Sequence, residues 1–234
     1  MTTFALVHGA WHGAWCWERL APLLQQAEHD VVAMDLPIDD NLATCDTLAD
    51  AVCSAIDGHG DDVIAVGHSY GGLVIPLVAT RRPVRHLVYL CAYTPKIGHS
   101  FGDQLRDEPD MLNPAVYGAL QPDEQSRQVW ADFELTRELL YADCDEDTAK
   151  AAFTRLRPQA DHPTYVPCSL TEYPSVSSTS IVCTDDMALR LRWAKQIANG
   201  RPGSEIIELP GSHSPFLSRP QALADVLLQI AEKV

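Results

Sequence analysis

Short apolar segments alternate with longer amphipathic segments along most of the chain. The apolar segments are rich in Val, Ile and Leu on both faces, which is typical of parallel strands covered by helices on each side. The predicted strands are Phe4–Val7, Val31–Met34, Val63–Gly67, His86–Cys91, Thr179–Cys183 and Glu205–Leu209. The predicted helices are roughly Ala14–Gln26, Asp46–Ile56, Gly71–Thr80, Met187–Ala198 and Pro220–Glu232. This order predicts an α/β fold with a doubly wound, mostly parallel sheet of about six strands.

One long stretch between the fourth and fifth strands interrupts this alternation. It contains helical patterns at Asp123–Tyr141 and Asp145–Arg155 but no predicted strand. Structureless loops of this length are uncommon, and disordered segments are poor in aromatic residues. We therefore predict one domain over all 234 residues, with a core at 1–93 and 174–234 and a helical cap at 94–173. The aromatic residues spread through the cap are Tyr117, Trp130, Phe133, Tyr141, Phe153 and Tyr165.

Charge and composition exclude several classes of partner. The formal net charge is -15 and the sequence pI is about 4.8, so the surface repels nucleic acids and anionic membranes. No apolar run approaches the roughly 20 residues of a membrane span. The apolar N-terminal segment has no basic residues and is interpreted as a strand, not as a signal peptide. The seven cysteines form no C-x-x-C pair, which predicts reduced thiols in a cytoplasmic protein with no structural zinc and no redox site.

The strongest chemical signal is the pattern Gly67-His68-Ser69-Tyr70-Gly71. This G-x-S-x-G pattern lies between a predicted strand and a predicted helix, which is the context of a nucleophile on a sharp turn. Such a turn forces the central residue into strained backbone angles and brings neighbouring chain segments close, so the positions two before and two after it require glycine. Ser69 is therefore the predicted nucleophile.

A serine hydroxyl is a weak nucleophile and requires a base. Among nine histidines, His213 follows the last predicted strand, and loops after the carboxyl ends of parallel strands meet where ligands bind. His68 adjoins the serine, but its side chain is expected to point away from it. His213 is therefore the predicted base.

The base needs an acid that fixes its tautomer and stabilises its charged form. The loop after the fifth predicted strand supplies Asp185 and Asp186, and the order Ser, Asp, His is the one that this type of fold uses. Successive residues of a tight loop face different directions, so one aspartate is expected to reach His213 and the other to cap the next helix. Asp35 is the third candidate and is interpreted as structural.

The loop His8–Gly13 is the candidate oxyanion site. Its glycines allow the backbone to approach a substrate. The backbone amides of Ala10 and Tyr70 could together donate to a tetrahedral oxyanion, each contributing roughly 3 kcal/mol.

These segments together resemble the plant methylesterase and hydroxynitrile lyase family and its bacterial esterase-like relatives, members of the α/β-hydrolase superfamily. The resemblance extends over nearly the whole chain. It implies an α/β-hydrolase fold, Asp186 as the acid, Ala10 and Tyr70 as the oxyanion donors, and a cap over an apolar pocket. The segments that carry the resemblance are His8–Trp15, Gly67–Gly72, Val182–Asp186, Gly211–His213, and Leu140–Cys144 with Arg155–Gln159 in the cap.

Two positions depart from the lyase branch of that family. Lyases carry a threonine where Gly9 stands, to hold a cyanohydrin hydroxyl, and a lysine where Ser214 stands, to meet leaving cyanide. A lyase without that cation lacks its charge stabiliser, so ester hydrolysis is favoured. A further departure is Pro76, which falls inside the helix predicted after the nucleophile and should kink it.

The leading hypothesis is therefore a serine carboxylesterase that acts on a small, largely apolar ester and needs no metal or organic cofactor. The alternatives are a carbon–carbon lyase of the hydroxynitrile type and a small-ligand receptor with negligible turnover on the same fold. The sequence predicts no nucleic-acid or membrane partner and leaves a homodimer open.

Overall fold

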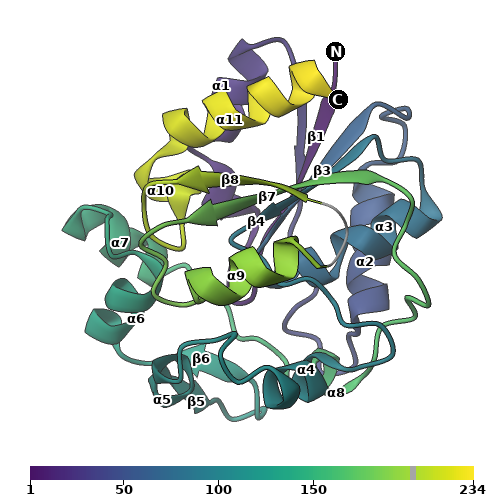
Figure 1. Ribbon diagram of the computed structural model, residues 1–234. Coiled ribbons are helices and arrows are strands. Elements are labelled where there is room, and N and C mark those ends of the chain that lie inside the picture. The colour runs from purple at the N-terminus through teal and green to yellow at the C-terminus, as the bar shows by residue number, and fades with distance from the viewer. Residues whose placement is uncertain (201–203) are drawn as a thin grey trace.

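Six parallel strands form the central sheet, in the spatial order β2-β1-β3-β4-β7-β8 (Figure 1). The computed structural model describes residues 1–200 and 204–234; residues 201–203, in the predicted core segment 174–234, lie outside the described residues. This sheet confirms the predicted α/β class and the mostly parallel, six-stranded architecture. The strands are β1 (Thr3–Val7), β2 (Asp30–Ala33), β3 (Val63–His68), β4 (His86–Leu90), β7 (Ser177–Cys183) and β8 (Ser204–Leu209).

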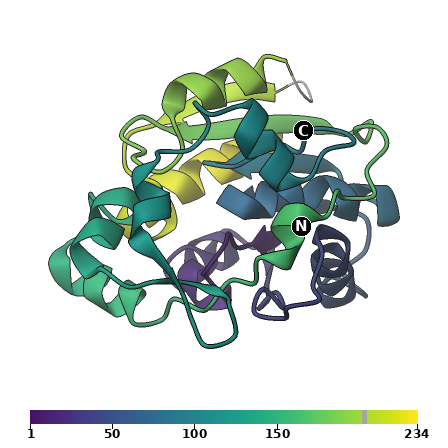
Figure 2. The same ribbon diagram turned by 90° about the horizontal axis from the view of Figure 1, so that it is seen from below.

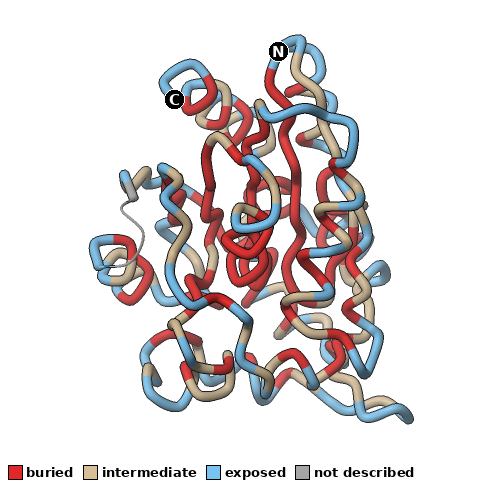
Figure 3. The backbone as a smooth tube through the Cα atoms, turned by 90° about the vertical axis from the view of Figure 1, so that its right-hand side faces the viewer, coloured by how far each residue is buried: buried red, intermediate tan, exposed pale blue. Residues whose placement is uncertain are grey.

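Helices cover both faces of the sheet. Helix α1 packs against α11 and α2 packs against α3, and Figure 1 shows these two pairs on opposite sides of the strands. The central strands are buried, whereas the edge strands β2 and β8 are only partly buried, and most exposed positions lie on the outer helices and loops (Figure 3). The core helices are η1 (Ala14–Trp17), α1 (Ala21–Gln26), α2 (Cys45–Ala55), η2 (Ser69–Leu73), α3 (Ile75–Arg81), α9 (Leu191–Ala198), α10 (Pro215–Ser218) and α11 (Pro220–Lys233).

Three predicted helices of the core differ from the observed ones. The segment Ala14–Gln26 is divided into a 3-10 turn and a short α-helix, and Met187–Ala198 becomes helical only at Leu191. The segment Gly71–Thr80 is also divided, into η2 and α3. Pro76 therefore stands in the first turn of α3, where no N–H bond is lost, and the predicted kink does not occur.

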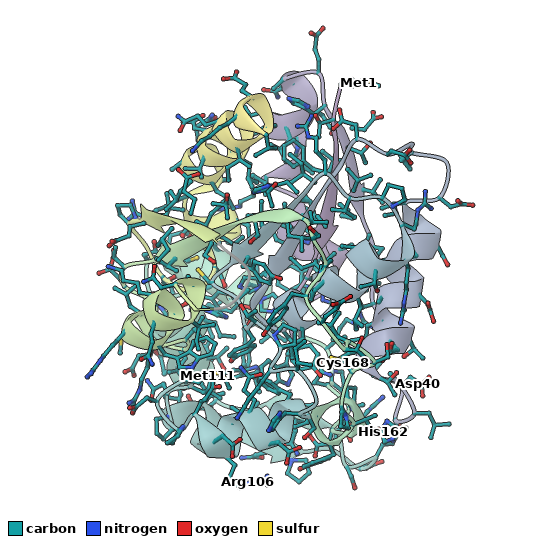
Figure 4. All side chains as sticks on the ribbon, turned by 45° about the vertical axis from the view of Figure 1, so that its right-hand side comes forward. Met1, Asp40, Arg106, Met111, His162 and Cys168 are labelled. Atoms are coloured by element: carbon teal, nitrogen blue, oxygen red, sulfur yellow. The ribbon has the colours of Figure 1, made fainter. Side chains whose placement is uncertain are left out.

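The cap occupies the chain between β4 and β7 and lies at one end of the molecule (Figures 1 and 2). Figure 4 labels Arg106 and His162 at this end and Met1 at the opposite end. Among the described residues no helix is long and apolar enough to cross a membrane. The cap elements are α4 (Phe101–Asp107), α5 (Ala115–Ala119), β5 (Leu120–Pro122), β6 (Gln128–Trp130), α6 (Phe133–Leu140), α7 (Glu146–Phe153) and α8 (His162–Tyr165).

The predicted helix Asp123–Tyr141 is wrong in its first half. Strands β5 and β6 form an antiparallel hairpin there, and the Asp123 side chain accepts hydrogen bonds from the backbone N–H groups of Gln125 and Arg127 in its turn (2.8 and 2.9 Å). An aspartate that satisfies turn amides competes with helix formation. Helix α6 begins only at Phe133, after Asp132 has capped it.

Candidate active site

The turn that carries Ser69 is built between β3 and η2. Ser69 has a φ of 50°, a left-handed conformation that costs energy for a residue with a side chain. A Cβ atom placed on Gly67 would lie 2.6 Å from the carbonyl oxygen of Gly71, and one on Gly71 would lie 2.6 Å from that of Val7. The flanking glycines are therefore required by close backbone approach, as the motif predicts.

The structure brings His213 and Asp186 together. His213 Nδ1 lies 2.8 Å from Asp186 Oδ2, and both side chains are 3% exposed. The second oxygen, Asp186 Oδ1, accepts the backbone N–H groups of Ala188 and Leu189 at 2.8 Å each. These bonds orient the carboxylate toward His213, so His213 Nδ1 carries the proton and Nε2 carries the lone pair.

Asp185 has a different role from the one predicted for the second aspartate. Its carboxylate accepts the N–H of Gly211 at 3.2 Å and the hydroxyl of Thr184 at 3.0 Å, and α9 has no side-chain cap. The expectation that one aspartate caps this helix is wrong. Asp185 instead ties its own loop to the loop that presents His213.

His68 contacts the loop that carries His213. Its Nε2–H donates to the carbonyl oxygen of His213 at 3.0 Å, and the two rings lie 4.8 Å apart between centroids. Complete burial lowers the pKa of His68 well below its ordinary value, so the ring stays neutral. His68 is therefore a packing and positioning partner of the His213 loop.

The loop after β1 approaches Ser69, with Gly9 packed against His68 and Ser69. His8 Nε2 accepts the N–H of Leu36 at 2.9 Å, so Nδ1 carries the proton and donates to the carbonyl oxygen of Gly9 at 2.8 Å. That carbonyl belongs to the same peptide unit as the N–H of Ala10. The N–H of Tyr70 lies in the first turn of η2, where amides have no partner within the helix. Burial lowers the pKa of His8 to about 4, which keeps this arrangement uncharged.

A pocket of about 500 Å³ joins these groups to the cap. Ser69 and His213 lie at its wall together with Ala10 and Tyr70. Trp130 of the cap also lines it. No cluster of three potential metal ligands occurs in residues 1–200 and 204–234. Further aromatic and aliphatic lining residues are Trp11, Tyr93, Phe101, Leu112, Leu120 and Leu140.

Tyr93 is a site residue that sequence reasoning missed. Its N–H donates to the carbonyl oxygen of Ser69 at 3.1 Å, and its ring lines the pocket next to Phe101, with centroids 4.7 Å apart. Burial raises the pKa of the Tyr93 hydroxyl, and the neighbouring Ser69 side chain slightly opposes this shift. Its position just after β4 is the same signal that identified His213 after β8, but tyrosine belongs to no motif.

A strained serine turn beside a buried His–Asp pair, on a parallel sheet with an inserted cap, defines a class of α/β enzymes. The chain belongs to the alpha/beta hydrolase family, whose model matches residues 4–226.

Known proteins can be aligned with this chain over nearly its whole length. Norfluorocurarine synthase 2 of Strychnos nux-vomica is 32% identical over 99% of this chain and 96% of its own length. Methylesterase 7 of Arabidopsis thaliana is 31% identical over 98% and 96% of the two chains. In the crystal structure of a pyrethroid hydrolase from Sphingobium faniae JZ-2, the fold matches with a TM-score of 0.86 and 23% identity, over 99% of this chain and 97% of that chain.

Proposed function

We propose that this protein is a serine hydrolase that cleaves a small, largely apolar carboxylic ester. The observation that carries this proposal is the buried 2.8 Å contact between His213 Nδ1 and Asp186 Oδ2, at a pocket that Ser69 also lines. The similarity to a methylesterase at 31% identity supports ester hydrolysis.

The proposed reaction proceeds through an acyl-enzyme. Ser69 Oγ attacks the ester carbonyl carbon while His213 Nε2 takes the hydroxyl proton, and Asp186 stabilises the imidazolium that forms. The tetrahedral intermediate collapses when His213 gives this proton to the departing alcohol oxygen. A water molecule, deprotonated by His213, then attacks the acyl carbon and releases the carboxylic acid and Ser69.

The oxyanion of each tetrahedral intermediate is assigned to the N–H groups of Ala10 and Tyr70. Both residues line the pocket with Ser69, and preorganised backbone donors are effective because they need no reorientation during the reaction. The aromatic and aliphatic walls of the pocket favour an apolar substrate, since they offer few partners to a charged group.

Steric crowding disfavours the cyanohydrin lyase alternative. A Cβ atom on Gly9 would lie 2.9 Å from both His68 Nδ1 and Ser69 Cβ, so a threonine here would displace the nucleophile or its support. Ser214 is fully buried at the start of α10, where a lysine ammonium would be costly. The oriented His213–Asp186 pair likewise disfavours the receptor alternative, because ligand binding alone does not require it.

Hydrolysis of p-nitrophenyl esters of increasing acyl length by the wild type and Ser69→Ala tests the proposal. We expect p-nitrophenol release that the substitution reduces to background. Full activity in Ser69→Ala would refute the serine mechanism. Cyanide release from mandelonitrile without ester hydrolysis would favour the lyase, and saturable ligand binding without turnover would favour the receptor.

A further inference from the structure

His12 links the candidate oxyanion loop to the cap. The His12 ring is buried, with Nδ1 2.9 Å from the carbonyl oxygen of Ala10 and Nε2 2.9 Å from the hydroxyl of Tyr141. A carbonyl oxygen only accepts, so Nδ1 carries the proton, and Nε2 must accept from the Tyr141 hydroxyl. The Tyr141 hydroxyl in the cap therefore donates to His12, and His12 donates to the Ala10 carbonyl oxygen in the loop.

The loop that receives this bond is strained. Trp11 has a φ of 61°, which is rare for a bulky residue and persists only where the surroundings hold it. The Ala10–Trp11 peptide therefore needs external support. His12 Nδ1–H holds its carbonyl oxygen, and the N–H of Arg157 donates to the Trp11 carbonyl oxygen at 2.7 Å.

We propose that Tyr141 and His12 are positioning residues of the oxyanion site: the cap tyrosine, through His12, holds the Ala10–Trp11 peptide so that the Ala10 N–H faces the substrate carbonyl. This inference rests on the proposed function. It makes the cap a part of the catalytic apparatus as well as a wall of the pocket.

The packing around His12 does not by itself account for a histidine. The ring stacks on Trp15 and meets His68 and Phe216 edge-on, with centroids 5.4 to 5.9 Å apart. An apolar ring would make the same contacts without burying two nitrogen atoms. Burial lowers the pKa of His12 to about 3, so the ring contributes no charge. What it adds is the pair of directed hydrogen bonds.

Matched variants separate this role from packing. Tyr141→Phe removes only the hydroxyl that donates to His12. Its control is Tyr89→Phe, because Tyr89 is also buried and its hydroxyl has no hydrogen-bond partner among the described residues. His12→Asn keeps an N–H near the place of Nδ1, whereas His12→Leu has a similar shape and no donor. Both His12 variants lose the imidazole ring, so a difference between them reports the N–H donor and not the packing of the ring.

The readout is covalent labelling by a fluorophosphonate, which requires no knowledge of the substrate. Ser69 Oγ attacks phosphorus, fluoride leaves, His213 takes the serine proton, and the phosphoryl oxygen occupies the oxyanion site. We expect Tyr141→Phe to be labelled about 10-fold and His12→Leu about 100-fold more slowly than the wild type, because a lost oxyanion donor costs about 100- to 1000-fold. His12→Asn should react at least 10-fold faster than His12→Leu, and Tyr89→Phe within twofold of the wild type.

Ester kinetics and melting curves complete the test. For Tyr141→Phe, kcat should fall while KM stays within twofold, in a protein that remains folded. Wild-type rates in Tyr141→Phe and equal rates in the two His12 variants would overturn the inference and leave the hydrolase proposal intact. A rise in KM with unchanged kcat would also overturn it, by assigning Tyr141 to substrate binding. Absence of labelling in the wild type would instead overturn the proposed function.

Discussion

Asp185 and Asp186 are adjacent in the chain but have different partners. Asp186 contacts the His213 ring and two backbone amides, whereas Asp185 is exposed and contacts Gly211 and Thr184. The tautomer of the His213 ring therefore depends on Asp186 alone.

This difference predicts opposite outcomes for two isosteric substitutions. Asp186→Asn should lower kcat about 10,000-fold, because the amide no longer fixes the His213 tautomer or stabilises its cation. Asp185→Asn should retain activity within a few-fold, since it removes only part of a loop contact. Initial rates on the best p-nitrophenyl ester measure both, and equal losses in the two variants would contradict the assignment of Asp186.

Tyr93 gives a smaller prediction at the same scale. Its ring and Ser69 line the same pocket, and a neutral hydrogen bond between the two hydroxyls would contribute about 0.5 to 1.5 kcal/mol. Tyr93→Phe should therefore lower kcat about 2- to 12-fold and leave KM unchanged, while Tyr89→Phe, within β4, has no effect. Steady-state kinetics of the two variants test this, and unchanged kcat in Tyr93→Phe would remove the hydroxyl from the mechanism.

The sequence predicted some residues of the candidate site but not others. Ser69 and His213 stand in short segments whose spacing and position after strands indicate chemistry. His12 and Tyr141 are 129 residues apart, and only the folded cap brings their side chains together. The tautomer of His8 similarly depends on the N–H of Leu36, a contact that spacing along the chain does not reveal.

At the scale of elements, the central strands β1, β3, β4 and β7 follow the hydrophobic pattern closely because they are buried on both faces, whereas the edge strands β2 and β8 are only partly buried. Helices deviate from the pattern, in the cap and in the core, where side chains compete for backbone amides. Asp123 holds a turn in a segment with helical periodicity, and Asp186 binds the amides that would otherwise begin the helix predicted from Met187. The hydrophobic periodicity of a segment indicates which positions are buried, whereas these polar contacts determine the residue at which a helix begins.

Pro76 provides a test of an element boundary. In the first turn of α3 its fixed φ is compatible with the helix, so Pro76→Ala mainly increases the entropy of the unfolded chain. We expect the free energy of unfolding to fall by about 0.5 to 1 kcal/mol, as measured by urea denaturation. A proline inside a continuous helix costs about 3 kcal/mol, so a gain in stability on substitution would contradict the observed break.

At the scale of the whole molecule, the protein contains several buried neutral histidines, three of which surround the site. Burial lowers the pKa of His8 and His86 to about 4, that of His12 to about 3, and that of His68 well below its ordinary value. Unfolding restores an ordinary pKa near 6.5. The unfolded chain therefore binds more protons than the folded chain below pH 6.5.

This difference in bound protons predicts that the folded protein loses stability in acid, at pH values above those at which carboxylates titrate. Since stability falls with decreasing pH wherever the unfolded state binds more protons, the free energy of unfolding should be level above pH 7 and decline from about pH 6.5 toward pH 4. Each such histidine contributes a slope of up to about 1.4 kcal/mol per pH unit. Urea denaturation between pH 4.5 and 8 measures this slope. His12→Asn should reduce this slope by up to about 1.4 kcal/mol per pH unit, because one of the four buried imidazoles is gone. An unchanged slope in this variant would show that the folded protein protonates His12. Stability that rises toward pH 5 would show that the buried histidines are not held neutral.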